Sequence, residues 1–372
     1  MRAAALACLA GLALLTLVAA PASAWIPNDT GIAGRTPGGW QQDQWNFLPG
    51  TGVDAPRAWD NLIAAGRPGG KGVKIAVLDS GVSYRRSPEL APVRFQKGRD
   101  FCARSTTGGD LSCAGEDADP ADDYGHGTHI ASTIAERTNN GKGLTGLAYG
   151  ATIIPVKVLD RDGDGDERSI SKGLHYAADR GAQIINLSVQ FGSSTDSAAQ
   201  IPKIAAAVRY AQRKGALIVA AAGNIAYDEV AYPAALPGVL SVGAITEHGC
   251  RAVYSNTGPD LDLVAPGGGQ DAAGCGVAGP AGRSILQLAF TRNNRVFRYP
   301  RTYYGTSMAA AHVTATAALV IASGVLGPHP TPQQIEERLK ATARDLGAPG
   351  PDEQYGAGLV DAGAATSPTP LR

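Results

Sequence analysis

Short apolar segments alternate with amphipathic ones along most of this 372-residue sequence, and this alternation restricts the fold more than any other feature. The apolar segments are nearly continuous runs of aliphatic residues, as is typical of strands buried on both faces of a parallel sheet. We therefore predict an α/β protein with three layers, a mostly parallel sheet flanked by helices on both faces. The expected strands are 73–78, 153–159, 184–187, 217–222, 239–244 and 261–264. The expected helices are 55–65, 126–137, 169–180, 201–214, 306–321 and 331–343, with irregular chain at 25–52 and turns at 97–125.

The start of the chain has the features of a secretory signal peptide. Arg2 supplies positive charge, residues 9–20 are apolar, and residues 22–24 (Ala-Ser-Ala) form a small-residue cleavage motif. We predict that residues 1–24 are the signal peptide, that residues 25–366 form one domain and that residues 367–372 are a loose tail. An uncleaved membrane anchor is the alternative, which the short apolar run disfavours. We expect a secreted protein, extracellular or periplasmic, without membrane contact after cleavage.

Positive and negative charges in this sequence are balanced. The chain has 33 basic and 33 acidic residues and a formal net charge of +0. No basic run or patch stands out, so nucleic acid is not an expected partner. Hydrophobic residues make up 44% of the sequence, which permits a sizeable core. We expect the protein to be a monomer.

Four cysteines remain once Cys8 leaves with the signal peptide, namely Cys102, Cys113, Cys250 and Cys275. An even number of cysteines in an exported protein indicates disulfides. Three pairings are possible, and the simplest joins the cysteines that are neighbours in the sequence, 102 with 113 and 250 with 275. A zinc site is the alternative, but the sequence has no Cys-x-x-Cys pair.

Residues 305–312 read Gly-Thr-Ser-Met-Ala-Ala-Ala-His and predict a tight turn that leads into an apolar helix. Ser307 would lie near the N-terminus of that helix, where free N–H groups and the positive end of the helix dipole favour developing negative charge. Such a position suits a nucleophilic hydroxyl. Taken alone, the stretch is explained equally well by ordinary helix capping.

Two upstream residues favour the interpretation of Ser307 as a nucleophile over ordinary helix capping. Asp79 ends the expected strand 73–78, at the edge where parallel sheets place their sites, and His126 begins an expected helix. A catalytic serine needs a base to take its proton and a carboxylate to orient that base. The chain supplies Asp, His and Ser in that order. An esterase of the α/β-hydrolase type would need a Gly-x-Ser-x-Gly motif and the order Ser, Asp, His, and the sequence has neither.

The residues around these three positions resemble those of the subtilisin-like serine peptidases. The resemblance covers nearly all of residues 27–364, and Pro-Asn-Asp at 27–29 is most similar to the thermitase branch. The matching segments are 77–82 (Val-Leu-Asp-Ser-Gly-Val), 125–129 (Gly-His-Gly-Thr-His), 186–188, 221–224 (Ala-Ala-Gly-Asn), 232–234, 265–267, 305–309 and 355–360. The resemblance implies a subtilisin-like fold and a serine endopeptidase that hydrolyses polypeptides through an acyl-enzyme. A non-catalytic binding protein on the same scaffold is the alternative.

The resemblance also implies roles for individual residues. Ser307 would be the nucleophile, His126 the general base and then acid, and Asp79 the group that orients the histidine. Asn224 matches the side-chain amide of the family's oxyanion hole. The residues that match substrate-binding positions are Ser188, Val189, Gln190, Ala221, Ala222, Gly223 and Ala231.

Three positions depart from the pattern of the family. Gln190 replaces a glycine and should crowd or polarise the rim of the specificity pocket. Tyr304 replaces a small residue, and Ala311 replaces a proline, which should affect helix packing rather than chemistry. The small residues of the pocket walls predict that the substrate has a large apolar or aromatic residue before the cut. Gln190 should narrow the range of residues that the pocket accepts. Asp228 and Glu229 in the following loop would instead favour Lys or Arg.

Residues 138–144 resemble the strong calcium loop of the family. Calcium prefers six to eight oxygen ligands. The implied ligands are the carbonyl oxygens of Thr138, Lys142 and Leu144, the side-chain oxygen of Asn140, and the carboxylates of Glu89 and Asp29. A plain Asn-Gly turn beside solvated acidic residues is the alternative.

A second acidic segment, residues 160–166, superficially resembles an EF-hand loop. Ser171 stands at the twelfth position, where an EF-hand requires a bidentate glutamate. We interpret the segment as a solvated acidic loop.

Overall fold

The computed structural model describes residues 24–103, 113, 115–276, 279–290 and 296–369, so most of the predicted signal peptide and the end of the predicted tail lie outside the described residues. The strands are β1 (Lys74–Asp79), β2 (Arg94–Phe95), β3 (Arg99–Ala103), β4 (Gly115–Asp117), β5 (Thr152–Lys157), β6 (Ile184–Leu187), β7 (Leu217–Ala221), β8 (Val239–Ile245), β9 (Leu263–Pro266), β10 (Ala289–Phe290) and β11 (Phe297–Arg298). In this part of the chain nine strands form one sheet, in the order β4-β3-β5-β1-β6-β7-β8-β9, with β2 paired to β5. All neighbours run parallel except β3 and β4, and β10 and β11 form a separate hairpin.

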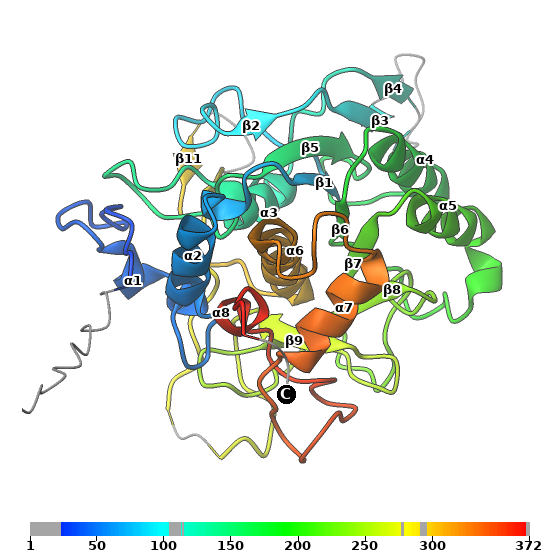
Figure 1. The fold of residues 1–372 in the computed structure, drawn as a ribbon. Coiled ribbons are helices and arrows are strands. Elements are labelled where there is room, and N and C mark those ends of the chain that lie inside the picture. The colour runs from blue at the N-terminus through cyan, green and yellow to red at the C-terminus, as the bar shows by residue number, and fades with distance from the viewer. Residues whose placement is uncertain (1–23, 104–112, 114, 277–278, 291–295, 370–372) are drawn as a thin grey trace, which may run out of the picture.

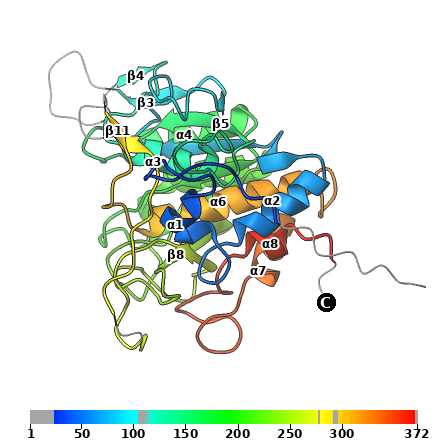
Figure 2. The same ribbon diagram turned by 90° about the vertical axis from the view of Figure 1, so that its left-hand side faces the viewer.

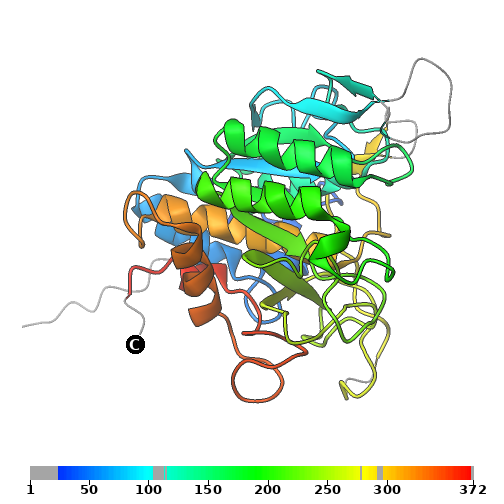
Figure 3. The ribbon, with the colours of Figure 1, turned by 90° about the vertical axis from the view of Figure 1, so that its right-hand side faces the viewer.

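Helices cover both faces of this sheet, which confirms the predicted three-layer α/β architecture. The α-helices are α1 (Trp40–Asp43), α2 (Ala55–Ala64), α3 (His126–Ala135), α4 (Glu167–Asp179), α5 (Pro202–Arg213), α6 (Thr306–Ser323), α7 (Pro332–Ala341) and α8 (Ala362–Ala365). Short 3-10 helices are η1 (Trp45–Phe47), η2 (Pro68–Gly70) and η3 (Ala198–Gln200). Figure 3 shows α4 and α5 side by side on one face, and Figure 2 shows the opposite side with α2 and α6.

Each face of the sheet has its own hydrophobic core, because successive residues of a strand point to opposite faces. In β1, Ile75 and Val77 belong to the core beneath α2, α3 and α6. Ala76 and Leu78 belong to the core beneath α4 and α5. The central strands are therefore apolar at nearly every position, as the sequence predicts.

Helix α6 lies in the middle of the molecule (Figure 1) and packs against β6, β7, β8 and β9. Among the described helices it alone is long and apolar enough to cross a membrane, but 89% of that span is buried inside the fold. A helix that is apolar all round is expected in the core of a large protein. Its burial fixes the position of its first turn, which carries Ser307.

Two segments expected to be irregular contain regular structure. Residues 25–52 include α1 and η1, because Trp40 and Phe47 are fully buried and pack edge-on against Trp59 of α2, with ring centroids 5.5 and 6.2 Å away. The turn-rich segment 97–125 includes β3 and β4, since β3 pairs with the edge of β5. Tertiary pairing determines both, and no local sequence signal marks them.

Candidate active site

Three of the predicted site residues lie at the carboxyl edge of the parallel sheet, the edge where open α/β folds bind their ligands. Asp79 is the last residue of β1, Ser188 directly follows β6, and Asn224 lies three residues after β7. His126 is the first residue of α3, and Ser307 is the second residue of α6. The helices α3 and α6 pack against each other, so both helix N-terminal residues are held by the same core.

Close packing at the start of α3 sets the position of His126. A Cβ atom on Gly127 would lie only 2.2 Å from the carbonyl oxygen of Gly81, so only glycine fits there. The N–H of Gly127 donates to the hydroxyl of Ser80 at 3.0 Å. The first turn of α3 therefore lies directly on the loop that follows β1, which brings the imidazole to Asp79.

Asp79 and His126 form a direct hydrogen-bonded pair. The two carboxylate oxygens of Asp79 lie 2.8 and 2.9 Å from Nδ1 of His126, and the Asp79 side chain is completely buried. Burial alone would lower the pKa of His126, but the charge and hydrogen bond of Asp79, with the charge of Asp122, outweigh it and raise the pKa above 6.5. Because Nδ1 faces the carboxylate, Nε2 is the nitrogen free to exchange a proton with a substrate or nucleophile.

Ser307 is nearly buried, with 8% of its surface exposed. Its hydroxyl lies 3.4 Å from the carbonyl oxygen of Ser188, and the hydroxyl of Ser188 donates to the carbonyl of Ser307 at 3.1 Å. Within the described residues no hydrogen bond joins the hydroxyl of Ser307 to His126. Catalytic hydrogen bonds are often long before substrate binds. Asp79 and His126 are thus in direct contact, whereas His126 and the hydroxyl of Ser307 are not hydrogen-bonded in this state.

Asn224 has a defined orientation beside Ser307. Its side-chain oxygen accepts the N–H of Thr306 at 2.8 Å and the hydroxyl of Thr306 at 2.9 Å. The amide nitrogen therefore points away from Thr306, and it donates to the side-chain oxygen of Gln190 at 3.2 Å. An amide donor next to the nucleophile is the group that an oxyanion hole requires.

The remaining predicted substrate-binding residues form two neighbouring segments after β6 and β7, which are adjacent parallel strands. Ser188 and Val189 are buried and Gln190 is partly exposed. Ala221 and Ala222 are buried, and the N–H of Ala231 donates to the carbonyl of Ala222 at 2.8 Å. A Cβ on Gly223 would lie 3.0 Å from that of Ala231, so the structure brings these small residues together as one wall.

Asp122, a residue outside the predicted site, organises the approach to His126. Its fully buried carboxylate accepts the N–H groups of Tyr124, Gly125 and Thr128, each at 2.9 Å. It also accepts the hydroxyls of Ser80 at 2.9 Å and Thr128 at 2.6 Å. Burial raises the pKa of Asp122, although these hydrogen bonds oppose that effect. No capping signal marks Asp122 in the sequence, because the N-cap of α3 is Gly125, three residues further along the chain.

The predicted calcium residues lie close together at the loop after α3. The carboxylate of Asp29 accepts the N–H groups of Asn139 and Asn140 at 2.7 and 2.8 Å. The amide of Asn140 donates to Glu89 at 2.5 Å, and its oxygen accepts the N–H of Lys142 at 2.9 Å. Burial, with the nearby charge of Glu89, raises the pKa of Asp29, although the backbone N–H donors oppose this.

A third carboxyl group, Glu136, lies beside this loop and was not predicted. It is fully buried, and its Oε1 atom has no hydrogen-bond partner among the described residues. Burial and the charge of Glu89 raise its pKa well above the ordinary value. Crowded carboxyl groups with an unsatisfied oxygen fit a hard cation, which would relieve their repulsion. In the part of the chain that the structure describes, no group of three or more His, Cys, Asp or Glu is arranged as a metal centre, so an ion would depend on the loop oxygens as well.

The acidic segment 160–166 folds on itself. One carboxylate oxygen of Asp160 accepts the N–H groups of Asp162 and Asp164 at 2.9 and 3.0 Å. Asp166 caps α4, where its side chain accepts the N–H of Ser169 at 2.6 Å. The cap moves the start of α4 ahead of the predicted residue 169.

Both predicted disulfides are confirmed, Cys102 with Cys113 and Cys250 with Cys275. Of the three possible pairings, the chain forms the one between sequence neighbours.

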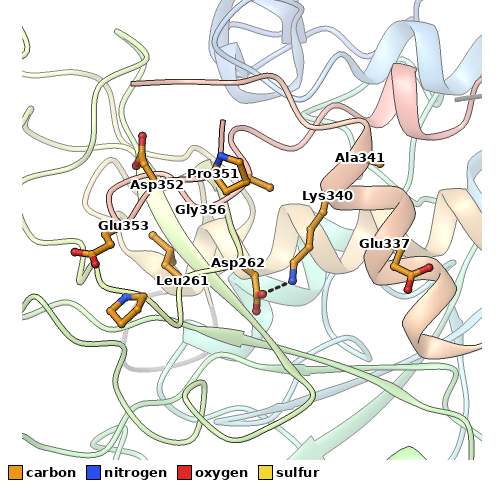
Figure 4. A pocket seen from close by; sticks show the side chains of 11 residues that line it. Leu261, Asp262, Glu337, Lys340, Ala341, Pro351, Asp352, Glu353 and Gly356 are labelled. Atoms are coloured by element: carbon orange, nitrogen blue, oxygen red, sulfur yellow. Dashed lines mark ion pairs between the residues drawn. The ribbon is translucent and has the colours of Figure 1, made fainter. Parts of the chain in front are cut away.

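A cavity of about 730 Å³ is lined by residues of α7, of the segment before β9 and of the segment 351–357 (Figure 4). Its wall includes the ion pair of Lys340 with Asp262, and Asp262 directly precedes β9, whereas the predicted catalytic residues lie beyond the carboxyl ends of the strands. None of the predicted site residues lines it. The cavity is therefore separate from the candidate active site.

A three-layer α/β fold with a buried aspartate–histidine pair near a serine at a helix N-terminus defines a protein of the serine hydrolase class. Comparison with known proteins narrows the class. Residues 70–358 match the model of the subtilase family. The chain belongs to this family, and it is a subtilisin-like serine endopeptidase.

Individual relatives agree with this assignment. The chain is 36% identical to subtilisin BL of Lederbergia lenta over 318 residues, which cover 84% of this chain and 96% of that protein. It is 36% identical to a thermostable alkaline protease of Halalkalibacterium halodurans over 299 residues, which cover 80% of this chain and 68% of the relative. Its fold matches a solved structure of a protease from Pseudoalteromonas arctica with a TM-score of 0.72 and 30% identity, covering 92% of this chain and 99% of that one.

Proposed function

We propose that this protein is a secreted endopeptidase that cleaves polypeptides through an acyl-enzyme on Ser307. His126 takes the proton of the Ser307 hydroxyl and later gives it to the leaving amine. Asp79 holds the imidazole in the required tautomer and stabilises its protonated form. The observation that carries the proposal is the hydrogen bond between the fully buried Asp79 and Nδ1 of His126, which leaves Nε2 available for the serine.

The acyl-enzyme mechanism also needs stabilisation of the tetrahedral oxyanion. The amide nitrogen of Asn224 and the N–H of Ser307 supply donors from the same region, since Asn224 is bonded to Thr306, the residue before Ser307. A single such donor contributes about 10²–10³ in rate. The substrate would lie along residues 188–190, where an extended peptide can pair with backbone groups. The small walls formed by Ala221, Ala222 and Gly223 favour a large apolar side chain before the cut.

Secretion is proposed from the N-terminal sequence and from the two disulfides. Disulfides persist mainly in oxidising compartments outside the cytosol. We further propose that the mature protein acts as a monomer.

Calcium is proposed as a structural ion at the loop after α3. Asp29, Glu89, the side-chain oxygen of Asn140, and the carbonyls of Thr138, Lys142 and Leu144 would hold it. The support is the convergence of Asp29 and Glu89 on this loop beside the unsatisfied carboxyl of Glu136. A bound calcium ion would neutralise this charge and tie the N-terminal segment to the loop.

The catalytic proposal is tested with denatured casein and the Ser307→Ala variant. The wild-type protein should hydrolyse casein, and the variant should lose nearly all of this activity while keeping the circular dichroism spectrum of the wild type. A folded variant with undiminished hydrolysis would refute the proposed nucleophile. A folded wild-type protein without any hydrolysis would favour the alternative of a non-catalytic binding protein.

A further inference from the structure

We propose that Gln190 acts as a latch on the oxyanion hole. In the free enzyme its side-chain oxygen holds the amide of Asn224, and a substrate must displace it before reaction. This inference rests on the proposed function, because it assigns a regulatory step to the same site. It goes beyond the expectation that Gln190 crowds the pocket rim, since it connects the pocket to the catalytic donor.

Two hydrogen bonds form the latch. The side-chain oxygen of Gln190 accepts the backbone N–H of Asn224 at 2.8 Å. The same oxygen accepts the side-chain N–H of Asn224 at 3.2 Å. Both distances are those of ordinary hydrogen bonds, so one acceptor engages the backbone nitrogen and the side-chain nitrogen of Asn224.

Backbone donors fix the orientation of both side-chain amides. Asn224 must present its oxygen to the N–H of Thr306, which lies 2.8 Å away and can only donate. Its nitrogen therefore faces Gln190. Gln190 must in turn present its oxygen to the backbone N–H of Asn224, which also can only donate. Neither amide can be reversed without leaving a backbone donor facing another donor.

The latch spans the two walls of the proposed substrate pocket. Gln190 lies on the segment after β6, and Asn224 lies on the segment after β7, which is the neighbouring parallel strand. The residues that line the second wall, Ala221, Ala222 and Gly223, are too small to support a contact across this space. The contact between Gln190 and Asn224 therefore joins the two segments that would form the pocket.

Competition between two acceptors gives the latch its effect. The side-chain oxygen of Gln190 and the oxygen of a reacting carbonyl are both acceptors for the side-chain nitrogen of Asn224. This nitrogen carries two N–H groups, and Gln190 engages one of them. A substrate must break the contacts with Gln190 to use that N–H group, and the lost contacts reduce the apparent affinity. A large side chain before the cut displaces Gln190 sterically, whereas a small one leaves it in place. Gln190 is therefore a specificity-determining residue as well as a latch.

The test compares Gln190→Ala, which removes the latch, with Gln190→Glu, which strengthens it. A carboxylate accepts both donors of Asn224 in charge-assisted hydrogen bonds and repels the oxyanion. Gln333→Ala is the control, because Gln333 is an exposed residue of α7 that donates to Glu337. The measurements are kcat and KM on peptide anilides with Ala or Phe before the cut, and inhibition by a peptide boronic acid with Phe at that position.

We expect Gln190→Ala to raise kcat/KM roughly three- to tenfold, as expected for the loss of competing neutral hydrogen bonds. The gain should be larger with Ala before the cut than with Phe, and the boronic acid should bind more tightly by a similar factor. Gln190→Glu should lower kcat/KM by about tenfold and weaken the boronic acid. Gln333→Ala should match the wild type.

Three outcomes would overturn the latch. One is unchanged kinetics and inhibition in both Gln190 variants. A second is a fall in kcat/KM of both variants by the same factor with equally lowered melting temperatures, which would mean that Gln190 only supports the loop. The third is a fall in kcat alone in Gln190→Ala, which would mean that Gln190 assists the oxyanion hole. Failure of the proposed function is recognised separately, because either the wild type would then show no hydrolysis or Ser307→Ala would keep the wild-type activity.

Discussion

At the residue scale, the chemistry of this site depends on a carboxyl group that is hydrogen-bonded in a fully buried position. Asp79 has no exposed surface, and it accepts hydrogen bonds from the N–H of Ser80 at 2.7 Å and from His126. A buried charge is tolerated only where it is hydrogen-bonded or paired. Here the pair also raises the basicity of the imidazole, which suits a general base.

Replacing Asp79 with Asn should reduce kcat/KM by about 10³–10⁴-fold, because the amide would hold His126 in the wrong tautomer. The rate also requires neutral His126, so wild-type kcat/KM should fall as the pH drops through a pKa above 6.5. Loss of the Asp79 charge should move this limb of the residual activity to lower pH. The measurement is kcat/KM against pH.

Asp119→Asn serves as the control, since Asp119 is an exposed residue that pairs with Arg85. It should leave both the rate and the pH profile unchanged. An Asp79→Asn variant with the wild-type acidic limb would contradict the assigned role of this carboxylate.

The residues that we propose as catalytic could be selected from the sequence because each one lies in a short run of neighbours with restricted geometry, such as Gly125 to Gly127 around His126. Asp122 could not, because its role depends on donors that meet only in the folded loop. The contact of Gln190 with Asn224 could not be predicted either, since the two residues are 34 positions apart in the sequence. The sequence could show that Gln190 was unusual, and only the fold shows what it binds.

At the element scale, the C-terminal end of α3 carries a buried carboxyl group, Glu136, whose charged form destabilises the folded state. Glu136 is the C-cap residue of this helix, where the dipole disfavours negative charge. Burial and Glu89 already raise its pKa well above 4.5. The folded state therefore binds a proton on Glu136 more tightly than the unfolded chain does. Its stability should fall as the pH rises from about 4.5 through the raised pKa.

Glu136→Gln should therefore raise the melting temperature by a few degrees at pH 8 in the presence of a chelator. The gain should vanish near pH 4, where the wild-type carboxyl is protonated in both states. The amide oxygen can still accept the side-chain N–H of Gln287, which donates to Glu136 at 2.5 Å. Thermal melts across this pH range provide the measurement, and an equal shift at both pH values would contradict the raised pKa of Glu136.

The loop after α3 gives a second prediction at this scale. A ligand that binds only the folded state stabilises it by about 3 kcal/mol at a hundredfold excess over its Kd. Chelation should therefore lower the melting temperature and speed autolysis in the N-terminal segment, and Asp29→Ala should weaken both effects. Thermal melts in millimolar calcium and in excess chelator provide the measurement.

Asp162→Ala is the matched control, because Asp162 is an acidic residue of the segment 160–166, which we interpret as a solvated loop. This variant should keep the calcium response. A melting temperature that does not change between calcium and chelator, with no ion found by metal analysis, would refute the site. Loss of the response in Asp162→Ala alone would place the ion in the segment 160–166 instead.

The central strands and long helices were predictable because their hydrophobic pattern and their burial agree. The strands β3 and β4 were not, since the short pairings of β3 with β5 and of β4 with β3 leave no clear pattern in the sequence. The short helix α1 could not be predicted for a similar reason, because it depends on the contact of Trp40 with Trp59 of α2, which forms only in the folded protein.

At the scale of the whole molecule, the fold brings together groups that are far apart in the chain. Asp79, His126 and Ser307 come from three elements, and the sheet and the core beneath α3 and α6 hold all three. The architecture was predictable, because alternating strands and helices have few ways to bury their apolar surface. The distance between His126 and Ser307 could not be predicted, since it depends on how those two helices pack.

The central claim is that Ser307 is activated as a nucleophile. Its most direct test is the reaction of the folded protein with phenylmethylsulfonyl fluoride, followed by intact-mass analysis and peptide mapping. We predict one phenylmethylsulfonyl group per chain, located on Ser307, with loss of casein hydrolysis in proportion to the modified fraction. An active protein that acquires no adduct, or one whose adduct lies on a different residue, would contradict the account.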